Sequence, residues 1–224
     1  YWSDIGRKAI FRARINGANA EQVVSIAPRF AVDIALDIAH SDIYWTALWL
    51  DGSRIQRTNL SHIQIHDVIT HPAGGITSLT VDPVFDKLYW TTVYPPSVQR
   101  ADCDGSFVAT LPIPDHVYPT GIHLDKGNEV LYWTDAEASL IRRASLDGTA
   151  VEDLGLIGLV TPGFLAVDSC FLDQTTHLET VTLLAKCLEG PGAFTTGQCH
   201  CADLSGDARI DLKDFDILQR VFQP

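Results

Sequence analysis

Six residues near the end of the sequence have the types and spacing of a calcium-binding loop. Counted from Asp203, side-chain oxygens stand at positions 1, 3, 5, 9 and 12, and the residue at position 7 can offer its backbone carbonyl. Ca²⁺ takes six to eight oxygen ligands, and alternate residues of a loop wrapped around one ion point inward. Four aspartates this close together repel one another unless a cation lies between them. The predicted ligands are Asp203, Ser205, Asp207, Arg209, Asp211 and Asp214.

A short helix is expected to follow this loop, because apolar residues recur with the spacing of one helical face. They are Leu212, Phe215, Leu218 and Phe222. Loop and helix together resemble half of a type I dockerin, the bacterial module with EF-hand-like Ca²⁺ loops that docks onto cohesin domains. The resemblance implies Ca²⁺ as a cofactor, a cohesin-like domain as a partner and secretion from a bacterium.

Four departures from the EF-hand and dockerin patterns lead us to expect weak Ca²⁺ binding. Ala208 stands at position 6, where an EF-hand has glycine, and Ser205 at position 3 is an uncharged ligand. Asp214 at position 12 is shorter than the bidentate glutamate of an EF-hand, although similar to dockerins. The second loop of a dockerin is missing. The alternative is an acidic, solvated turn that binds no specific ligand.

Cysteines crowd the stretch before the loop, where glycine, proline and threonine predict a flexible linker over 190–197. A Cys187–Cys199 or a Cys187–Cys201 disulfide would close a short loop there in an oxidising compartment. Cys103 and Cys170 stand alone in the sequence and are expected to be buried as small hydrophobes.

The sequence before the cysteine-containing stretch is organised as a repeat. A four-residue word recurs at intervals of 43, 45 and 43 residues and takes in four of the five tryptophans. Its copies are Tyr1-Trp2-Ser3-Asp4, Tyr44-Trp45-Thr46-Ala47, Tyr89-Trp90-Thr91-Thr92 and Tyr132-Trp133-Thr134-Asp135. A period of this length is that of a four-stranded propeller blade.

Other positions of the period recur in the same order. An aspartate ends a short apolar run seven residues before each later word, an arginine follows the word, and a hairpin turn dipeptide comes next. These residues are Asp37, Asp82 and Asp125, then Arg12, Arg100 and Arg143, then Asn16-Gly17, Asp104-Gly105 and Asp147-Gly148. Arg57 comes two residues late in the second copy, which predicts a two-residue insertion within 48–53.

Each period is predicted to form four short strands separated by turns that contain Pro, Gly or Asp. In the third copy we expect them at 76–81, 88–92, 97–101 and 107–111. The predicted fold is mainly β: a β-propeller with about four blades present and a small C-terminal loop-helix module.

In order and register these motifs resemble the YWTD propellers, also called low-density-lipoprotein-receptor class B repeats, over Tyr1 to about Asp168. The resemblance implies that the word lies on the second strand and packs between blades. Its final Asp survives as Asp4 and Asp135, while Ala47 and Thr92 replace it elsewhere. The blades with those two replacements are therefore expected to lose one polar anchor between blades.

The resemblance also implies six blades. Because the chain has no methionine and begins on a second strand, we expect further blades to precede Tyr1 in the parent protein. The alternative is a closed ring of four, in which Gly163–Asp168 supplies the missing first strand. The expected domains are the propeller over 1–168, the linker over 169–198 and the dockerin-like module over 199–224.

Composition narrows the range of partners. Sixteen basic against 28 acidic residues give a net charge of −12, which disfavours nucleic acid because a phosphate-binding surface needs a basic face. The longest apolar stretch, 154–167, contains Thr161 and Pro162 and is shorter than the roughly 20 residues of a membrane span.

The expected function is a secreted, non-enzymatic binding or scaffold protein whose loops on one propeller face bind an extracellular protein or glycan. One alternative is a propeller hydrolase or lactonase with a metal in the central channel. Another is a component of a polysaccharide-degrading complex, attached through its dockerin-like part. His62, His66 and His71 are expected to lie on the surface, without a catalytic role.

Overall fold

The structure is a computed structural model that describes residues 1–71, 75–113, 118–154, 162–165, 193–194 and 209–210. The chain divides between Val167 and Asp168 into two compact units. In the second unit the described residues form one antiparallel pair, β16 (Ala193–Phe194) with β17 (Arg209–Ile210). Among the described residues, no helix is long and apolar enough to cross a membrane.

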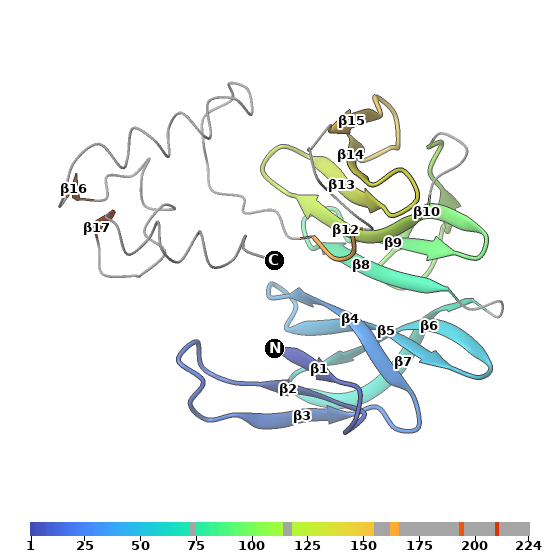
Figure 1. Cartoon of the computed structure of the whole chain (residues 1–224). Coiled ribbons are helices and arrows are strands. Elements are labelled where there is room, and N and C mark those ends of the chain that lie inside the picture. Colours follow the sequence, from blue (N-terminus) through green and yellow to red (C-terminus); the bar gives the residue numbers. More distant parts are fainter. Residues whose placement is uncertain (72–74, 114–117, 155–161, 166–192, 195–208, 211–224) are drawn as a thin grey trace. The chain divides into compact units, whose positions relative to one another are not determined.

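The first unit consists of four antiparallel sheets, which we number as blades in chain order (Figure 1). The first blade has three strands, β1 (Trp2–Asp4), β2 (Ala9–Arg12) and β3 (Glu21–Ser25). The second has β4 (Phe30–Asp37), β5 (Asp42–Trp49), β6 (Gly52–Asn59) and β7 (His62–His71). The third has β8 (Ile76–Asp82), β9 (Lys87–Val93), β10 (Pro96–Asp102) and β11 (Ala109–Thr110). The fourth has β12 (Pro119–Asp125), β13 (Val130–Asp135), β14 (Leu140–Ser145) and β15 (Glu152–Leu154).

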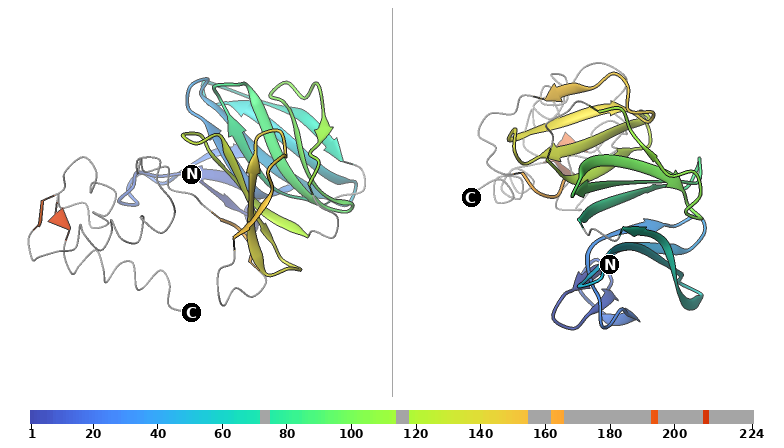
Figure 2. Two further views of the ribbon diagram at one scale, coloured as in Figure 1. Left: turned by 90° about the horizontal axis from the view of Figure 1, so that it is seen from above. Right: turned by 90° about the vertical axis from the view of Figure 1, so that its right-hand side faces the viewer.

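Strand order in each sheet follows the sequence, so every blade is a simple up-and-down meander. The first strands of successive blades pack side by side, β4 against β8 and β8 against β12, and Figure 2 shows the sheets following one another from two further directions. The predicted propeller of four-stranded blades is confirmed, including the first blade that begins at its second strand.

The repeated aspartates close the turn between the first and second strands. Asp37 accepts a hydrogen bond from the backbone N–H of His40 at 3.1 Å, and Asp82 and Asp125 accept equivalent bonds within their own turns. All three are buried. A carboxylate that receives backbone N–H groups in this way stabilises a tight turn.

The third blade departs from the prediction at its last strand, which covers only Ala109–Thr110 and not 107–111. Phe107 lies just after the Asp104-Gly105 turn with a φ of 53°, in the left-handed region. A residue there cannot continue an extended strand, so pairing begins two residues later.

The core lies between the blades. Tyr44 of the second blade and Trp90 of the third belong to one buried cluster, and Tyr89 and Trp133 share the next. Because successive residues of a strand face opposite sides, the Tyr-Trp pair packs against both neighbouring blades. The predicted packing role of the word is confirmed.

Cys103 lies in the first of these clusters, buried and without a disulfide. Burial raises the pKa of its thiol to about 12, so the side chain stays protonated and acts as a small hydrophobe, as predicted. Cys170, Cys187, Cys199 and Cys201 lie outside the described residues.

The two-residue insertion falls where it was predicted. In the second blade Tyr44 pairs with Arg57, and the strands continue to the Trp49–Gly52 pair before they turn. In the third blade Tyr89 pairs with Arg100, and the strands end one residue sooner, at the Val93–Pro96 pair. Each strand of the β5–β6 hairpin is therefore one residue longer than its counterpart in the third blade. Trp49 and Leu50 lie at the tip of this longer hairpin.

Candidate functional site

Of the predicted calcium ligands, the structure describes only Arg209, which lies in β17 and pairs with Phe194. Asp203, Ser205, Asp207, Asp211 and Asp214 lie outside the described residues, as does the predicted helix. In the described part of the chain, no three His, Cys, Asp or Glu side chains form a group that could hold a metal ion.

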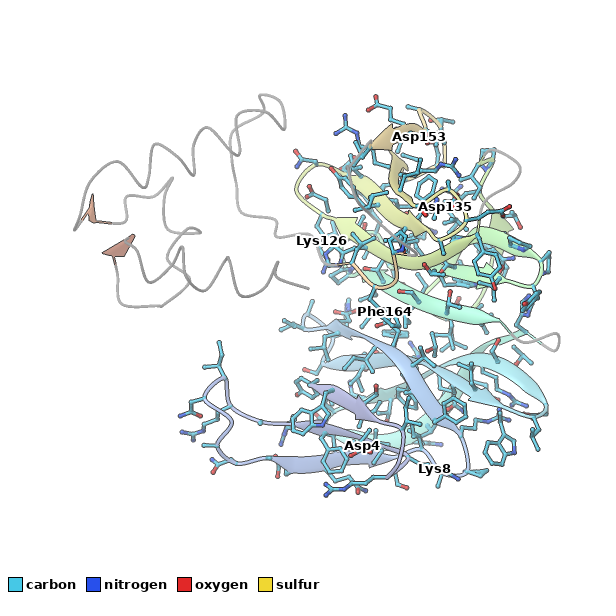
Figure 3. All side chains as sticks on the ribbon, in the orientation of Figure 1. Asp4, Lys8, Lys126, Asp135, Asp153 and Phe164 are labelled. Carbon is cyan, nitrogen blue, oxygen red and sulfur yellow. The ribbon has the colours of Figure 1, made fainter. Side chains whose placement is uncertain are left out.

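In the described part of the chain the final Asp of the word bonds within its own blade and not between blades, so that prediction was wrong. Asp135 accepts hydrogen bonds from the backbone N–H groups of Tyr118, Glu137 and Ala138 and from Arg142, all in its own blade. It closes the β13–β14 turn, because Glu137 and Ala138 belong to that turn; Figure 3 labels Asp135 on the fourth blade. In the third blade the Thr92 hydroxyl bonds the corresponding turn, because it donates to the Pro95 carbonyl at 2.6 Å.

In the second and third blades the repeated arginine makes a polar contact with the next blade. Arg57 donates from Nη1 to the Cys103 carbonyl at 3.5 Å, and Arg100 donates to the Leu146 carbonyl at 3.4 Å. Each acceptor lies 14 residues after the tyrosine of the following blade's word. The sequence showed that an arginine recurs, but its partner lies 46 residues away and could not be identified from spacing.

A second link runs along the innermost strands. Asp33 on β4 accepts from the Ser78 hydroxyl at 2.5 Å and from the Leu79 N–H at 3.0 Å, while Ser78 Oγ accepts the Ile122 N–H at 3.1 Å. These contacts connect three successive blades. Burial raises the pKa of Asp33. The prediction overlooked this position, although a polar or small residue recurs four places before the repeated aspartate, as Asp33, Ser78 and Gly121.

These inner residues occupy the place where the enzyme alternative needs its catalytic side chains. Ser78 is 2% exposed, and its hydroxyl is committed to Asp33 and to Ile122. At Gly121 an added Cβ would lie 2.5 Å from the Gly163 carbonyl oxygen, so the backbones approach as closely as glycine allows. The Ser78 hydroxyl is thus used to join blades, and Gly121 serves the close approach of the backbone at Gly163.

A different set of side chains is exposed at the end of the blades where the second strand turns into the third. We call this end the insertion face and define it by the turns at 5–8, 50–51, 94–95 and 136–139. Large apolar side chains project from it: Ile5 is 57% exposed, Trp49 38%, Leu50 94% and Tyr94 62%.

Charged neighbours hold the tip of the insertion in place. The Lys8 ammonium lies 5.0 Å from the centre of the Trp49 ring, a cation–π contact from the adjacent blade; Figure 3 labels Lys8 on that blade. Arg29 makes a two-pronged pair with Asp51 at 2.8 and 2.7 Å, which lowers the pKa of Asp51. Arg54 also donates to Asp51, at 3.0 Å.

Tyr94 extends the same face onto the third blade. Its hydroxyl contacts the hydroxyl of Tyr118, and this hydrogen bond raises the pKa of Tyr118. The insertion face therefore presents Trp, Tyr and Arg side chains from neighbouring blades, and several of them have fixed partners.

Comparisons with known proteins agree with this fold. The chain is 30% identical over 104 residues to protein cueball of Drosophila erecta, which covers 40% of the chain and 14% of that protein. It is 33% identical over 100 residues to human low-density lipoprotein receptor-related protein 5, which covers 43% of the chain and 6% of that protein. No protein-family model matches. The chain thus spans a small part of the curated relatives it matches.

Among solved structures, the chain resembles one in the crystal structure of a nidogen/laminin complex. The TM-score is 0.66 and the identity 26%, over 73% of this chain and 62% of that one. Together with the repeated word, these similarities support a YWTD β-propeller over the first unit.

Proposed function

We propose that this propeller is a secreted, non-enzymatic module that binds an extracellular protein partner through its insertion face. The observation that carries the proposal is the projecting Trp49-Leu50 tip, held by Lys8 and by the Arg29–Asp51 pair. The similarity to a chain in the crystal structure of a nidogen/laminin complex supports a role in protein binding.

The composition of the face suits a protein interface. Tyr, Trp and Arg supply most of the strongly contributing residues in such interfaces, because they bury a large area and lose little freedom when already held. Apolar side chains here lie beside paired charges of both signs, as in a hydrophobic centre with a polar rim. The net charge of −12 favours a neutral or cationic partner.

The proposal predicts where independently selected binders attach. We expect most peptides selected from a phage-displayed random library on the intact chain to lose at least about tenfold in affinity for Trp49→Ser/Leu50→Ser, because each truncated anchor removes roughly 1 kcal/mol or more. Affinities would be measured by biolayer interferometry against wild type and variant.

The matched control is Val84→Ser/Phe85→Ser, which removes two exposed apolar side chains from a turn at the opposite end of the blades. Binding of the selected peptides should be unaffected by this control. Peptides that depend on Val84 and Phe85, and not on Trp49 and Leu50, would move the binding face to the other side of the propeller.

We also propose that the loop from Asp203 to Asp214 binds Ca²⁺ and serves for attachment, with a cohesin-like domain as the candidate partner. The alternating oxygen side chains support this proposal. Calorimetric titration with Ca²⁺ is expected to give a dissociation constant of about 10⁻⁴ to 10⁻³ M, because Ser205 replaces one carboxylate. The heat should disappear in Asp203→Ala and persist in Asp104→Ala, a turn aspartate of the propeller. A wild-type chain without heat at millimolar Ca²⁺ would contradict the proposal.

A further inference from the structure

An open pocket of about 320 Å³ lies beside the outer strand of the second blade. Six polar residues line it, at the end of the blade opposite the Trp49-Leu50 tip. They are Asp42, Arg57, Asn59, His62, Gln64 and His66.

A β-bulge in β7 assembles this pocket. His66 pairs with Arg57 and His62 pairs with Asn59, so 63–65 face Thr58 alone. Two histidines four residues apart in the sequence are thereby placed opposite residues only two apart. Bulges re-aim side chains in this way and are frequent beside functional sites.

The bulge is held by a fully buried hydroxyl. Thr58 Oγ1 accepts the Gln64 N–H at 2.9 Å and lies 3.5 Å from the His62 carbonyl, to which it donates. The backbone of the bulge is thus fixed from inside the sheet, while the side chains of His62, Gln64 and His66 are exposed.

Some polar groups of the pocket have hydrogen-bond partners within the described residues, and others have none. Asn59 donates to Asp42 at 2.7 Å and to the His40 carbonyl at 2.9 Å, so its amide protons are both used. In the described part of the chain, the imidazoles of His62 and His66 and the side-chain amide of Gln64 have no hydrogen-bond partner. Arg57 lies 3.9 Å from Asp42 and makes only long contacts of 3.5 Å.

The pocket is specific to the second blade among those described. In the third blade Lys87 and Asp102 take the places of Asp42 and Asn59 and form an ion pair with each other. The outer strand β11 there has only two residues, against ten in β7. No side chains equivalent to the two histidines can therefore lie opposite Arg100.

We propose that this pocket binds a tetrahedral oxyanion, the phosphate or sulfate ester of a larger ligand. Arg57 supplies a permanent positive charge with a planar set of donors that suits such oxygens. Gln64 and the two imidazoles add donors around it. The site is separate from the insertion face and does not depend on the protein-binding proposal.

The probes are inorganic phosphate and inorganic sulfate, titrated into the full chain while the imidazole proton signals are followed by NMR. We expect saturable shifts of the His62 and His66 signals with both anions, and at least a tenfold loss of affinity in His62→Asn/His66→Asn. Thr58→Val, which removes the hydroxyl that holds the bulge, should weaken binding in the same direction. Ile63→Ala, which truncates an exposed apolar side chain of the same strand, should not.

The other charged groups near the site are Arg57, His40, Asp42 and Asp104. His62→Asn/His66→Asn retains all of them, so a loss of sulfate affinity in this variant is assigned to the two imidazoles.

Two results would overturn the proposal. One is a wild-type chain without saturable shifts at about 10 mM of either anion. The other is a double variant that folds, by its NMR spectrum, and binds sulfate as tightly as the wild type. Binding of sulfate but not phosphate, or the reverse, supports the pocket and identifies the ester it takes.

Discussion

Trp90→Ala is expected to destabilise the propeller by about 3–5 kcal/mol, the range for emptying a large, fully buried aromatic site. The Trp90 side chain is 0% exposed and lies between the second and third blades, against Tyr44 and the apolar residues of β8. Among the described residues, its indole N–H has no hydrogen-bond partner. The loss therefore comes from packing, because no bonded partner is left unsatisfied when the ring is removed.

The effect should appear in urea unfolding followed by tryptophan fluorescence and circular dichroism. The matched control is Trp2→Ala, the same residue of the word in the first blade. Trp2 is 41% exposed and stacks on Phe11 with 5.6 Å between ring centres. Its loss is expected to cost about 1 kcal/mol. Equal costs at the two positions would contradict the view that packing between blades holds the fold.

Much of the propeller could be predicted because each strand and turn of a blade has a local sequence motif. The word, the apolar run before it and the Asp-Gly turn are local signals, and the late Arg57 located the insertion to within a few residues. The strand at 107–111 was too long in the prediction because the left-handed Phe107 has no sequence signal of its own.

Contacts between blades could not be predicted in the same way. The acceptors of Arg57 and Arg100 are backbone carbonyls, which every residue carries, so spacing cannot single them out. The partner of the word's final aspartate was predicted wrongly for the same reason. A buried carboxylate can accept hydrogen bonds from the amides of its own turn or from a neighbouring blade, and the sequence does not distinguish the two.

The oxyanion pocket shows a further limit. His62, Gln64 and His66 alternate with isoleucines and match an ordinary outer strand, and their exposure agrees with the surface position predicted for the first and last of them. Only the bulge held by Thr58 brings the two histidines opposite Asn59 and Arg57. The Thr58 hydroxyl stabilises this register. Threonine is common in strands, so its presence at this position does not predict a bulge.

Asp135→Ala is expected to cost about 3 kcal/mol or more, because it removes one partner of a buried ion pair. The Asp135 side chain is 0% exposed and Arg142 is 11% exposed, with 2.5 Å between Oδ2 and Nη1. The substitution also leaves the N–H groups of Glu137 and Ala138 without their acceptor. Arg142 would keep only its contact with the exposed Asp153.

The third blade indicates which second substitution should restore part of the stability lost in an Asp135 variant. Thr92 and Gln99 occupy the positions of Asp135 and Arg142 there, and both are neutral. We therefore expect Asp135→Thr and Arg142→Gln each to destabilise, while the double variant is less destabilised than the sum by about 1–3 kcal/mol. Unfolding free energies from urea titrations of the four chains give this coupling energy. Additive costs would mean that the carboxylate stabilises the fold through the turn amides alone, since the loss of Arg142 would then be independent of Asp135.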